Sequence, residues 1–580
     1  MALVLFLLFL AATAQGKGRF RLGGLDFEHS EHRHSSLAPA PAPAPDPAPL
    51  TFFEVSKPLS IPRSGHCATL LLLKHSFGNT ISSPPVTAPY NPPRSSHCGG
   101  GWERVILRWS VASRGRQFDR ISAAWLSGVE IFRTCTAEPT KQGIVWSVEK
   151  DITKYTSLLE KPQVLAVSLA NVIDKTYTGF FNVTLTAEFY KPAQRNSKRS
   201  SKGMPADLVL PIALPTSENG GYWFQLQNSS HVGTVNLTSL PRNIYKAELE
   251  VCVSFHGDDE FWYTNPTNDY LDANGESSSG SRNGPYREVV VTLDGKLVGE
   301  ICPFPVIYTG GVNPLFWRPA AAIGAFNLPT YILDVTPFVG QLVDGNSHEI
   351  SLSVTNAVRN WLLDANLHLW LDHGSSQTSG KLVSYSSPPA DISYDSHYKG
   401  LDGTLQLFAS RSLQYSGYVE SSSHGKLITT SSYSYKFSNQ MIFSDNGSVS
   451  TVKQLIDAQT KFLVESSSKQ VRLQQKSSSY PFFLYNSQKD GTNKSVVLDA
   501  RISHGLQEEC DDDSFWSRLN NKQDTAGKIV IQANIVTSGT GKLNQTYVSE
   551  SSEGCYHRSI RTSNTTTQYD ESGFRCIASA

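Results

Sequence analysis

Hydrophobic and polar residues alternate along short segments of this chain, which is the pattern of half-buried β-strands. Residues 181–189 alternate Phe, Val, Leu, Ala and Phe with polar residues, and residues 249–256 show the same period of two. The run at 104–109 is more continuously apolar and predicts a buried strand. Asp294-Gly295 separates two valine- and leucine-rich runs and predicts a hairpin, because both residues tolerate positive φ.

The chain has 580 residues, too many for one core, so several domains are expected. The pattern predicts an all-β fold: two adjacent jelly-roll-like β-sandwich domains at 51–190 and 204–372, then a C-terminal β-rich domain at 396–580. A segment rich in Ser, Gly and Pro at 373–395 is interpreted as a linker. Helical periodicity is scarce, and residues 452–464 are the best candidate for a helix.

The first 14 residues have the features of a signal peptide: an apolar run, Leu3 to Leu10, and a small-residue site, Ala12-Thr13-Ala14. The run is much shorter than the roughly 20 residues that span a bilayer, so no membrane partner is expected. Residues 15–50 form an Ala/Pro-rich prosegment or linker, which behaves as an extended spacer. We therefore expect secretion, to the extracellular space, the cell wall or the vacuole.

Glycosylation motifs and cysteines agree with a secreted protein. Seven asparagines begin an Asn-x-Ser/Thr motif: Asn182, Asn228, Asn236, Asn446, Asn493, Asn544 and Asn564. None of the eight cysteines forms a CxxC pair, and an even number in a secreted chain favours disulfides. Five cysteines precede residue 310 and three follow residue 500. Either one bridge joins these two regions, or at least two cysteines are free.

Charge and motifs exclude several classes of protein. Lys and Arg total 51 and so do Asp and Glu, so no net field attracts nucleic acid, and no nucleic-acid partner is expected. HExxH, GxSxG, P-loop and dinucleotide-binding motifs are missing from the sequence. His29, His32 and His34 are interpreted as part of the solvated prosegment, and no metal or organic cofactor is expected.

The remaining candidates for functional residues are acidic residues that lie beside aromatic and basic ones near the ends of predicted strands. Asp119 precedes a strand at 123–126 and lies between two arginines, a setting that also suits a surface ion pair. In His256-Gly257-Asp258-Asp259-Glu260, consecutive carboxylates repel, which favours an elevated pKa in at least one of them, although a polar loop would look the same. A third aromatic segment ends in Trp317-Arg318 and equally suits an interface or an irregular part of the core.

These segments together resemble the peptide-N-glycanase A family, the plant and fungal peptide-N4-(N-acetyl-β-glucosaminyl)asparagine amidases. The segments that carry the resemblance are GRQFDR at 115–120, WLSGVEIFRTCTAEP at 125–139, GIVWSVEKDITKY at 143–155, IDKTYTGFFNV at 173–183, SFHGDDEFWYTNP at 254–266 and PFPVIYTGGVNPLFWRPAAAIGAF at 303–326. The resemblance implies hydrolysis of the amide between GlcNAc and Asn, often at acidic pH. The implied partners are N-glycopeptides or denatured glycoproteins, including core-fucosylated plant glycans. Some members are cut into heavy and light chains that stay associated.

A more distant resemblance, to the flavobacterial glycoamidase with its two jelly rolls, suggests roles for individual residues. It implies that Asp119 and Glu260 are catalytic. Arg120, His256, Trp262, Trp317 and Arg318 are the predicted substrate-binding residues, with the two tryptophans stacking on sugars. The bacterial enzyme has a further first-domain Glu with no evident match here, and Asn171 lies near its place, so that role is either lost or filled by another residue.

Three other functions are compatible with the sequence. A lectin-like β-sandwich would bind N-glycans without cleaving them, since a fold does not fix a function. A glycosidase would also use two carboxyl groups, but it would leave GlcNAc on the asparagine. A structural cell-wall glycoprotein would suit the Ala-Pro run but not the aromatic-rich folded domains.

Overall fold

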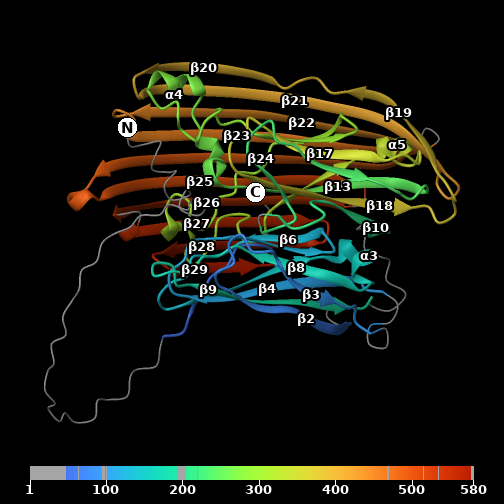
Figure 1. Ribbon diagram of the computed structural model, residues 1–580, viewed down its shortest axis with the longest axis horizontal. Coiled ribbons are helices and arrows are strands. Elements are labelled where there is room, and N and C mark those ends of the chain that lie inside the picture. The colour runs from blue at the N-terminus through green and yellow to red at the C-terminus, as the bar shows by residue number, and fades with distance from the viewer. Residues whose placement is uncertain are drawn as a thin grey trace, which may run out of the picture.

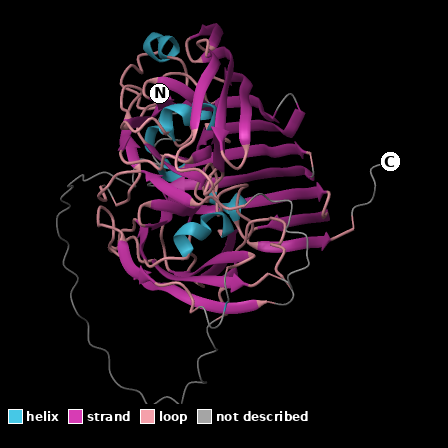
Figure 2. Cartoon of the chain, turned by 90° about the vertical axis from the view of Figure 1, so that its right-hand side faces the viewer, coloured by secondary structure: helices cyan, strands magenta, loops and turns pink. Residues whose placement is uncertain are grey.

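The computed structural model describes residues 47–62, 65–94, 98, 101–192, 204–218, 220–466, 469–513, 515–532 and 535–575. The predicted signal peptide and most of the Ala/Pro-rich segment, with its three histidines, lie outside these ranges. Strand accounts for 60% and helix for 7% of the structure, which confirms the all-β prediction. Figure 2 shows the few short helices set among long strands.

The first domain is a jelly roll whose strands alternate between two facing sheets. In chain order they are β2 (His66–Phe77), β3 (Val86–Tyr90), β4 (Arg104–Arg114), β5 (Ile121–Leu126), β6 (Val129–Cys135), β7 (Ile144–Asp151), β8 (Gln163–Leu169) and β9 (Phe180–Tyr190). One sheet has the order β7-β4-β9-β2, with the short β1 (Leu50–Thr51) beside β7, and the other has the order β3-β8-β5-β6. The first, eighth, third and sixth strands thus share a sheet, as in a double Greek key.

The second domain repeats this strand order. Its strands are β10 (Leu208–Ile212), β11 (Phe224–Leu226), β12 (Gly233–Leu237), β13 (Ile244–Phe255), β14 (Glu288–Leu293), β15 (Lys296–Ile301), β16 (Thr330–Asp334), β17 (His348–Thr355) and β18 (Trp361–Leu371). The sheets run β10-β18-β13-β16, with β11 also on β18, and β12-β17-β14-β15. Two jelly rolls of the same topology therefore follow each other in the chain, as predicted.

The C-terminal third is one antiparallel sheet of 11 strands, most of them unusually long. They are β19 (Ser379–Ser386), β20 (Asp391–Lys399), β21 (Asp402–Ser421), β22 (Gly425–Ser444), β23 (Val449–Ser466), β24 (Lys469–Asp490), β25 (Val496–Asp512), β26 (Phe515–Gln532), β27 (Ile535–Ser551), β28 (Gly554–Ser563) and β29 (Thr566–Gly573). Figure 1 shows this sheet running from β20, at the far side of the second jelly roll, down to β29 beside the first. One sheet therefore backs both jelly rolls.

The helical segments are short and lie in loops. They are η1 (Thr153–Tyr155), α3 (Thr156–Leu159), η2 (Gly257–Asp259), η3 (Trp262–Thr264), α4 (Asn268–Ala273), η4 (Pro314–Trp317), η5 (Thr336–Phe338), α5 (Val339–Leu342) and η6 (Thr492–Lys494). The helix predicted at 452–464 is wrong, because these residues belong to β23. Val452, Gln454 and Ile456 are buried there and alternate with exposed residues, so the true period is two. The expected linker at 373–395 contains β19 and the start of β20.

Local turn chemistry follows the sequence closely. Asp294 and Gly295 adopt φ of 48° and 75° between β14 and β15, which confirms the predicted hairpin. Ser127 and Gly128 adopt φ of 46° and 88° in the corresponding turn between β5 and β6. Both jelly rolls therefore use a two-residue turn with positive φ at the same place in their topology.

A buried ionic network joins the two jelly rolls. The Arg133 guanidinium on β6 bonds Glu130 at 2.6 Å and Asp364 of β18 at 3.3 Å, and all three side chains are at most 2% exposed. Arg133 also donates to the Ser254 hydroxyl at 3.0 Å and to the Leu362 carbonyl at 2.8 Å. Glu130, Asp364 and the nearby thiol of Cys252 have metal-ligand spacing, but the Arg133 guanidinium already pairs with both carboxyl groups, and burial and the charge of Glu130 raise the pKa of Asp364. This cation fixes β6 against β18.

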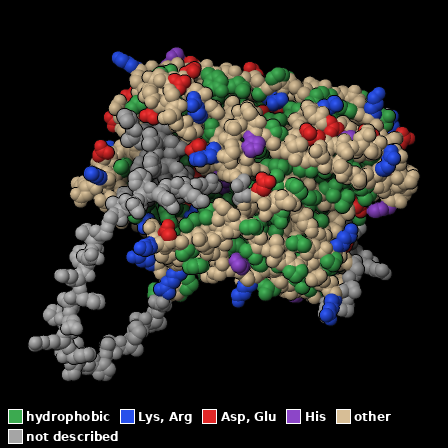
Figure 3. Space-filling view, in the orientation of Figure 1, with side chains coloured by type: hydrophobic (Ala, Val, Ile, Leu, Met, Phe, Trp, Pro, Cys, Tyr) green, Lys and Arg blue, Asp and Glu red, His purple; other side chains and the backbone are tan. Residues whose placement is uncertain are grey.

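The Cys67–Cys98 disulfide closes the edge of the first jelly roll. Cys135, Cys252, Cys302 and Cys510 are free thiols, which supports the reading in which some cysteines are unpaired. All seven asparagines of the glycosylation motifs are exposed, as modification would require. Within the described ranges, no helix has the length and apolarity to span a bilayer. Figure 3 shows acidic and basic side chains scattered singly over the face it displays.

Replacing Arg133 with Met should destabilise the protein strongly. The substitution leaves Glu130 and Asp364 buried without their cation, which costs about 3–5 kcal/mol. Arg518→Met is the matched control, because its ion pair with Glu509 is 3.7 Å long and both side chains are about 60% exposed. The urea midpoint of each variant measures the effect. Equal midpoints would contradict the role assigned to Arg133.

Candidate active site

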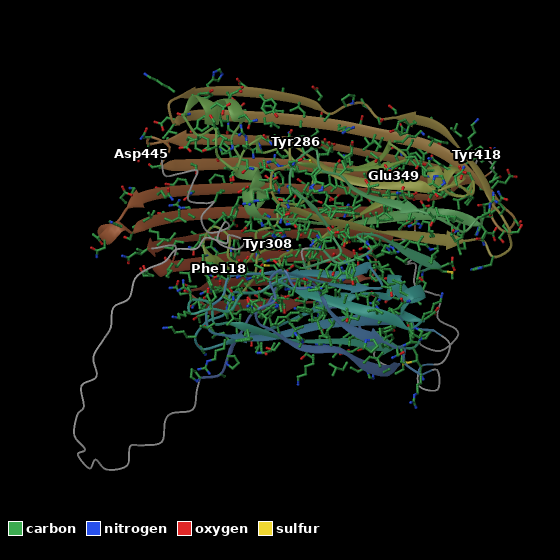
Figure 4. The ribbon with its side chains drawn as sticks, viewed as in Figure 1. Phe118, Tyr286, Tyr308, Glu349, Tyr418 and Asp445 are labelled. Carbon is green, nitrogen blue, oxygen red and sulfur yellow. A yellow bond between two sulfur atoms is a disulfide. The ribbon has the colours of Figure 1, made fainter. Side chains whose placement is uncertain are left out.

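A cleft of about 720 Å³ lies where the two jelly rolls and the C-terminal sheet meet. Asp119 and Glu138 of the first jelly roll face it, as does Glu260 of the second. Residues 535–539 of the C-terminal sheet complete its lining. Figure 4 shows two further lining residues, Phe118 and Tyr308, close together at the junction of the first jelly roll with the rest of the molecule. The cleft therefore draws on all three domains.

Asp119 lies in the loop that leads into β5. The loop is held by Arg120, whose backbone N–H donates to the Thr136 hydroxyl at 2.9 Å. The Asp119 carboxyl accepts hydrogen bonds from the backbone N–H of Gly310 and from the Cys135 thiol, the latter at 3.6 Å. Burial nevertheless raises the pKa of Asp119, and these bonds and the charge of Arg120 oppose the rise only in part.

Glu260 follows the turn η2, which caps the end of β13. The turn is anchored by Asp259, whose carboxylate pairs with Arg287 at 2.7 Å, both side chains being fully buried. Asp259 also accepts hydrogen bonds from the indole of Trp361 at 2.6 Å and from the backbone N–H of Val358 at 2.9 Å. Of the three consecutive acidic residues, Asp259 is thus a structural anchor that fixes where Glu260 points.

The Glu260 carboxyl carries a strongly raised pKa. Burial is the larger cause, and the negative charge of Asp119 across the cleft is the second. The prediction of an elevated pKa in this loop is confirmed: at Glu260 the cause is burial and the partner domain, whereas at Asp258 burial and the charge of Asp259 both raise the pKa. Two buried carboxyl groups that repel each other hold one proton between them over a wide pH range. One group is then an acid while the other is a base.

A third carboxyl group, Glu138, was not singled out by sequence reasoning. It is 7% exposed, lines the same cleft and pairs with Arg318 at 2.8 Å. Burial raises its pKa to about 7, with Arg318 lowering it and Asp119 raising it. A Cβ atom built on Gly310 would lie 2.5 Å from Oδ1 of Asp119 and 3.0 Å from Oε1 of Glu138. Both carboxyl groups therefore converge on one glycine.

Three of the predicted substrate-binding residues line the cleft. Arg120 donates to the Gln117 amide oxygen at 2.7 Å, while its buried Nε has no hydrogen-bond partner. Arg318 likewise has a buried, unpartnered Nε beside its ion pair with Glu138. The His256 ring stacks on Tyr308 at 5.1 Å, and burial lowers its pKa to about 3, so it is neutral. The two guanidinium groups therefore line the cleft, while their unpartnered Nε atoms are buried behind its surface.

The two tryptophans expected to stack on sugars are instead part of the core. Trp262 is fully buried and packs on Phe255 and Phe437. Trp317 is 1% exposed and donates its indole N–H to the Gly311 carbonyl at 2.9 Å. The prediction for these residues is therefore wrong, because a side chain without exposed surface cannot contact a ligand. The rings that do line the cleft include Phe118, Tyr177 and Trp223.

Asn171, which lies near the expected place of a further acidic residue, is fully buried. Its amide donates to the Phe77 and Gly179 carbonyls at 3.2 and 3.0 Å, so it braces two loops of the first jelly roll. Glu138 is the residue that supplies a further first-domain carboxyl group at the cleft.

A cleft with three carboxyl groups of raised pKa, four arginines and several aromatic rings defines a hydrolase-type site on an all-β scaffold. The family model described as peptide N-acetyl-β-D-glucosaminyl asparaginase amidase A matches residues 58–388, and that of its C-terminal domain matches residues 404–482. The chain belongs to this amidase A family.

A relative from Prunus dulcis agrees with this assignment. The chain is 43% identical to peptide-N4-(N-acetyl-β-glucosaminyl)asparagine amidase A of Prunus dulcis over 91% of this chain and 93% of the relative. Among solved structures, PNGase F, a glycosylasparaginase from Flavobacterium meningosepticum, matches at 14% identity and a TM-score of 0.34, covering 52% of this chain and 96% of that one. PNGF-II matches at 12% identity and a TM-score of 0.33, covering 53% of this chain and 65% of that one.

Replacing Glu260 with Gln should stabilise the protein at alkaline pH. A raised carboxyl pKa in the folded state stabilises the fold at low pH, and this contribution is lost as pH rises from the unfolded toward the folded pKa. The neutral amide removes that loss, so the melting temperature should rise by about 2–4 °C at pH 8 and change little at pH 4. Calorimetry checks this, with the exposed Glu553→Gln as control. A variant less stable than wild type at pH 8 would contradict the assigned electrostatics.

Proposed function

We propose that this protein hydrolyses the amide bond between N-acetylglucosamine and asparagine in N-glycopeptides. The observation that carries the proposal is the coupled pair of buried carboxyl groups, Asp119 and Glu260, which face one cleft from two domains. Family membership and the identity with the Prunus dulcis amidase support the same activity. Water adds to the asparagine carbonyl carbon, the C–N bond breaks, and the products are aspartate in the peptide and a glycosylamine.

The roles of base and acid follow from which of the two carboxyl groups keeps the single proton. Asp119 has more hydrogen-bond donors and a nearby guanidinium, so it is the group that ionises first and activates the water. Glu260 has the more strongly raised pKa and keeps the proton, which it gives to the carbonyl oxygen or to the leaving nitrogen. An amide requires both functions, because its leaving group is a poor one until it is protonated.

The surrounding side chains bind and orient the substrate. Arg120 and Arg318 line the cleft and place positive charge where hydroxyl or carbonyl oxygens of the substrate would lie. Glu138 holds Arg318 in place through their 2.8 Å ion pair. His256, neutral and stacked on Tyr308, donates or accepts a hydrogen bond at the cleft wall. Phe118 and Tyr177, whose rings lie 5.2 Å apart, provide apolar surface for sugar rings.

The proposal extends to the compartment and to the glycan. Seven exposed glycosylation motifs and the Cys67–Cys98 disulfide support secretion through the signal sequence. The cleft of about 720 Å³ leaves space for a branched core, which supports acceptance of core-fucosylated plant glycans. If the chain is cut into heavy and light chains, the ion pairs of Arg133 with Glu130 and Asp364 would hold the first and second jelly rolls together.

Mass spectrometry of a fucosylated glycopeptide after incubation at about pH 5 tests the activity and the catalytic pair together. Wild type should convert the glycosylated Asn to Asp, and Asp119→Asn and Glu260→Gln should each reduce release by about a hundredfold or more. The exposed Glu553→Gln is the matched control and should keep full activity.

Peptide that still carries GlcNAc on Asn would identify a glycosidase instead. Bound but uncleaved glycopeptide would identify a lectin.

The rate should depend on pH with two limbs. Below the raised pKa of Asp119 the base is protonated, and above the raised pKa of Glu260 the acid has lost its proton, so kcat/KM falls on both sides. The maximum should therefore lie between the pKa of Asp119 and the higher pKa of Glu260. Initial rates between pH 3 and about 9, with stability checked at each pH, measure the profile. A rate that rises steadily up to pH 9 would rule out an acid role for Glu260.

Gly310→Ala should lose activity while the protein stays folded. The added methyl would displace the carboxyl groups of Asp119 and Glu138, both in loops rather than in the core. A shift of even about 1 Å in a catalytic group costs on the order of a hundredfold in rate. Glycan release and circular dichroism measure the two effects, and the exposed Glu553→Gln is again the control. Normal release by Gly310→Ala would contradict the convergence described above.

A further inference from the structure

The C-terminal sheet contributes a wall to the cleft through its β26–β27 hairpin. Residues 535–539, at the start of β27, line the same space as Asp119 and Glu260. They lie beyond the 404–482 segment that matches the family's C-terminal domain, and more than 270 positions after Glu260 in the sequence. The long sheet thus does more than support the jelly rolls.

The base of this hairpin is fixed to the loop that carries Arg318. Gln523, which is fully buried on β26, donates to the Ala321 carbonyl at 2.8 Å and accepts from the Ile323 backbone N–H at 3.1 Å. The Asn313 amide donates to the Thr540 carbonyl at 3.3 Å. Gly541 runs so close to the Leu315 carbonyl that no side chain fits there. The hairpin is therefore held in register with the second jelly roll.

The hairpin presents two aliphatic side chains, Ile535 and Val536, to the cleft beside the polar Thr537 and Ser538. Val536 and Leu315 each pack on a small core of Leu498, Ile529 and Ile531, separate from the main core, and both also face the cleft. The aromatic rings Phe118 and Tyr177, by contrast, belong to the first jelly roll on the Asp119 side. Aromatic faces suit sugar rings, whereas aliphatic pockets suit apolar amino-acid side chains.

We propose that Val536 and Leu315 form a subsite for the amino-acid residue next to the glycosylated asparagine, so that the C-terminal hairpin selects the peptide part of the substrate. This inference rests on the proposed function, since it takes the substrate to be a glycopeptide. The glycan then occupies the aromatic side of the cleft and the peptide its aliphatic side. An apolar neighbour of the asparagine is preferred over a polar one, because it buries its side chain against Val536 and Leu315.

Calorimetric binding to full-length protein carrying Asp119→Asn tests the subsite independently of turnover. Two glycopeptides bear the same glycan and differ only in Leu or Ser beside the asparagine, and a third ligand is the same glycan on free asparagine. The Leu peptide should bind about fivefold to tenfold more tightly than the Ser peptide. Adding Val536→Ser should remove this preference and leave the free-asparagine ligand unaffected. Val471→Ser, an exposed valine (54%) of the same sheet, should keep the preference.

A second variant, Thr537→Trp, keeps the test valid if Val536→Ser misfolds. Thr537 is exposed at the cleft wall, so Thr537→Trp adds bulk without touching the core, and it should weaken both peptides but not the glycan on free asparagine. A preference that survives Val536→Ser would overturn the proposal. Equal weakening of all three ligands by both variants would also overturn it, because the hairpin would then contact the glycan. Failure of the proposed function would appear separately, as absence of Asp product with the wild-type protein.

Discussion

The mutual repulsion of two buried carboxyl groups is the constraint on which the site depends. Asp119 and Glu260 belong to different domains, and the negative charge of Asp119 makes ionisation of Glu260 unfavourable where burial already opposes it. Their separation is set by how the first jelly roll packs on the second. Arg133 fixes that packing, because its guanidinium bonds partners on β6 and β18, the strands next to those that lead to the two carboxyl groups.

The structure treats its buried charges in two opposite ways. Asp259 is fully paired with Arg287 and bonded to Trp361, so it stabilises its loop and takes no part in chemistry. Glu260, the next residue, faces the cleft and has a raised pKa. The pairing of Asp259 stabilises the fold. The raised pKa of Glu260 reduces the stability of the fold at neutral pH, and it keeps a proton available for the reaction. Asp259, whose charge and hydrogen bonds are satisfied, thus holds the catalytic group Glu260 in position.

Local features of the sequence were enough to predict strands and turns, but not which side chains face the cleft. Asp294-Gly295 determines its turn by its own backbone preferences, and alternation identified β9 and β13. Trp262 and Trp317 were misplaced, because an aromatic-rich loop looks the same whether its rings face a ligand or the core. Glu138 was overlooked because, in the sequence, it is a single Glu that precedes a Pro just after a strand segment. Its importance comes from Arg318 and Gly310, about 180 residues away.

The C-terminal sheet shows the same limit of prediction from local sequence, over a longer part of the chain. Residues 452–464 mix apolar and polar residues in a way that suits either period, and only pairing with β22 and β24 decides for a strand. The contribution of residues 535–539 to the cleft depends on contacts of Gln523 and Asn313 between distant segments. No local pattern contains that information.

The fate of the oxygen atom in the reaction tests the central claim most directly. The peptide product of a glycopeptide digested in water labelled with heavy oxygen is analysed by tandem mass spectrometry. Attack of water activated by Asp119 on the asparagine carbonyl predicts one heavy oxygen in the side chain of the new aspartate, and an unlabelled sugar at the moment of release. Heavy oxygen on the sugar carbon, with the peptide unlabelled, would show that the glycosidic side is cleaved and would contradict the account.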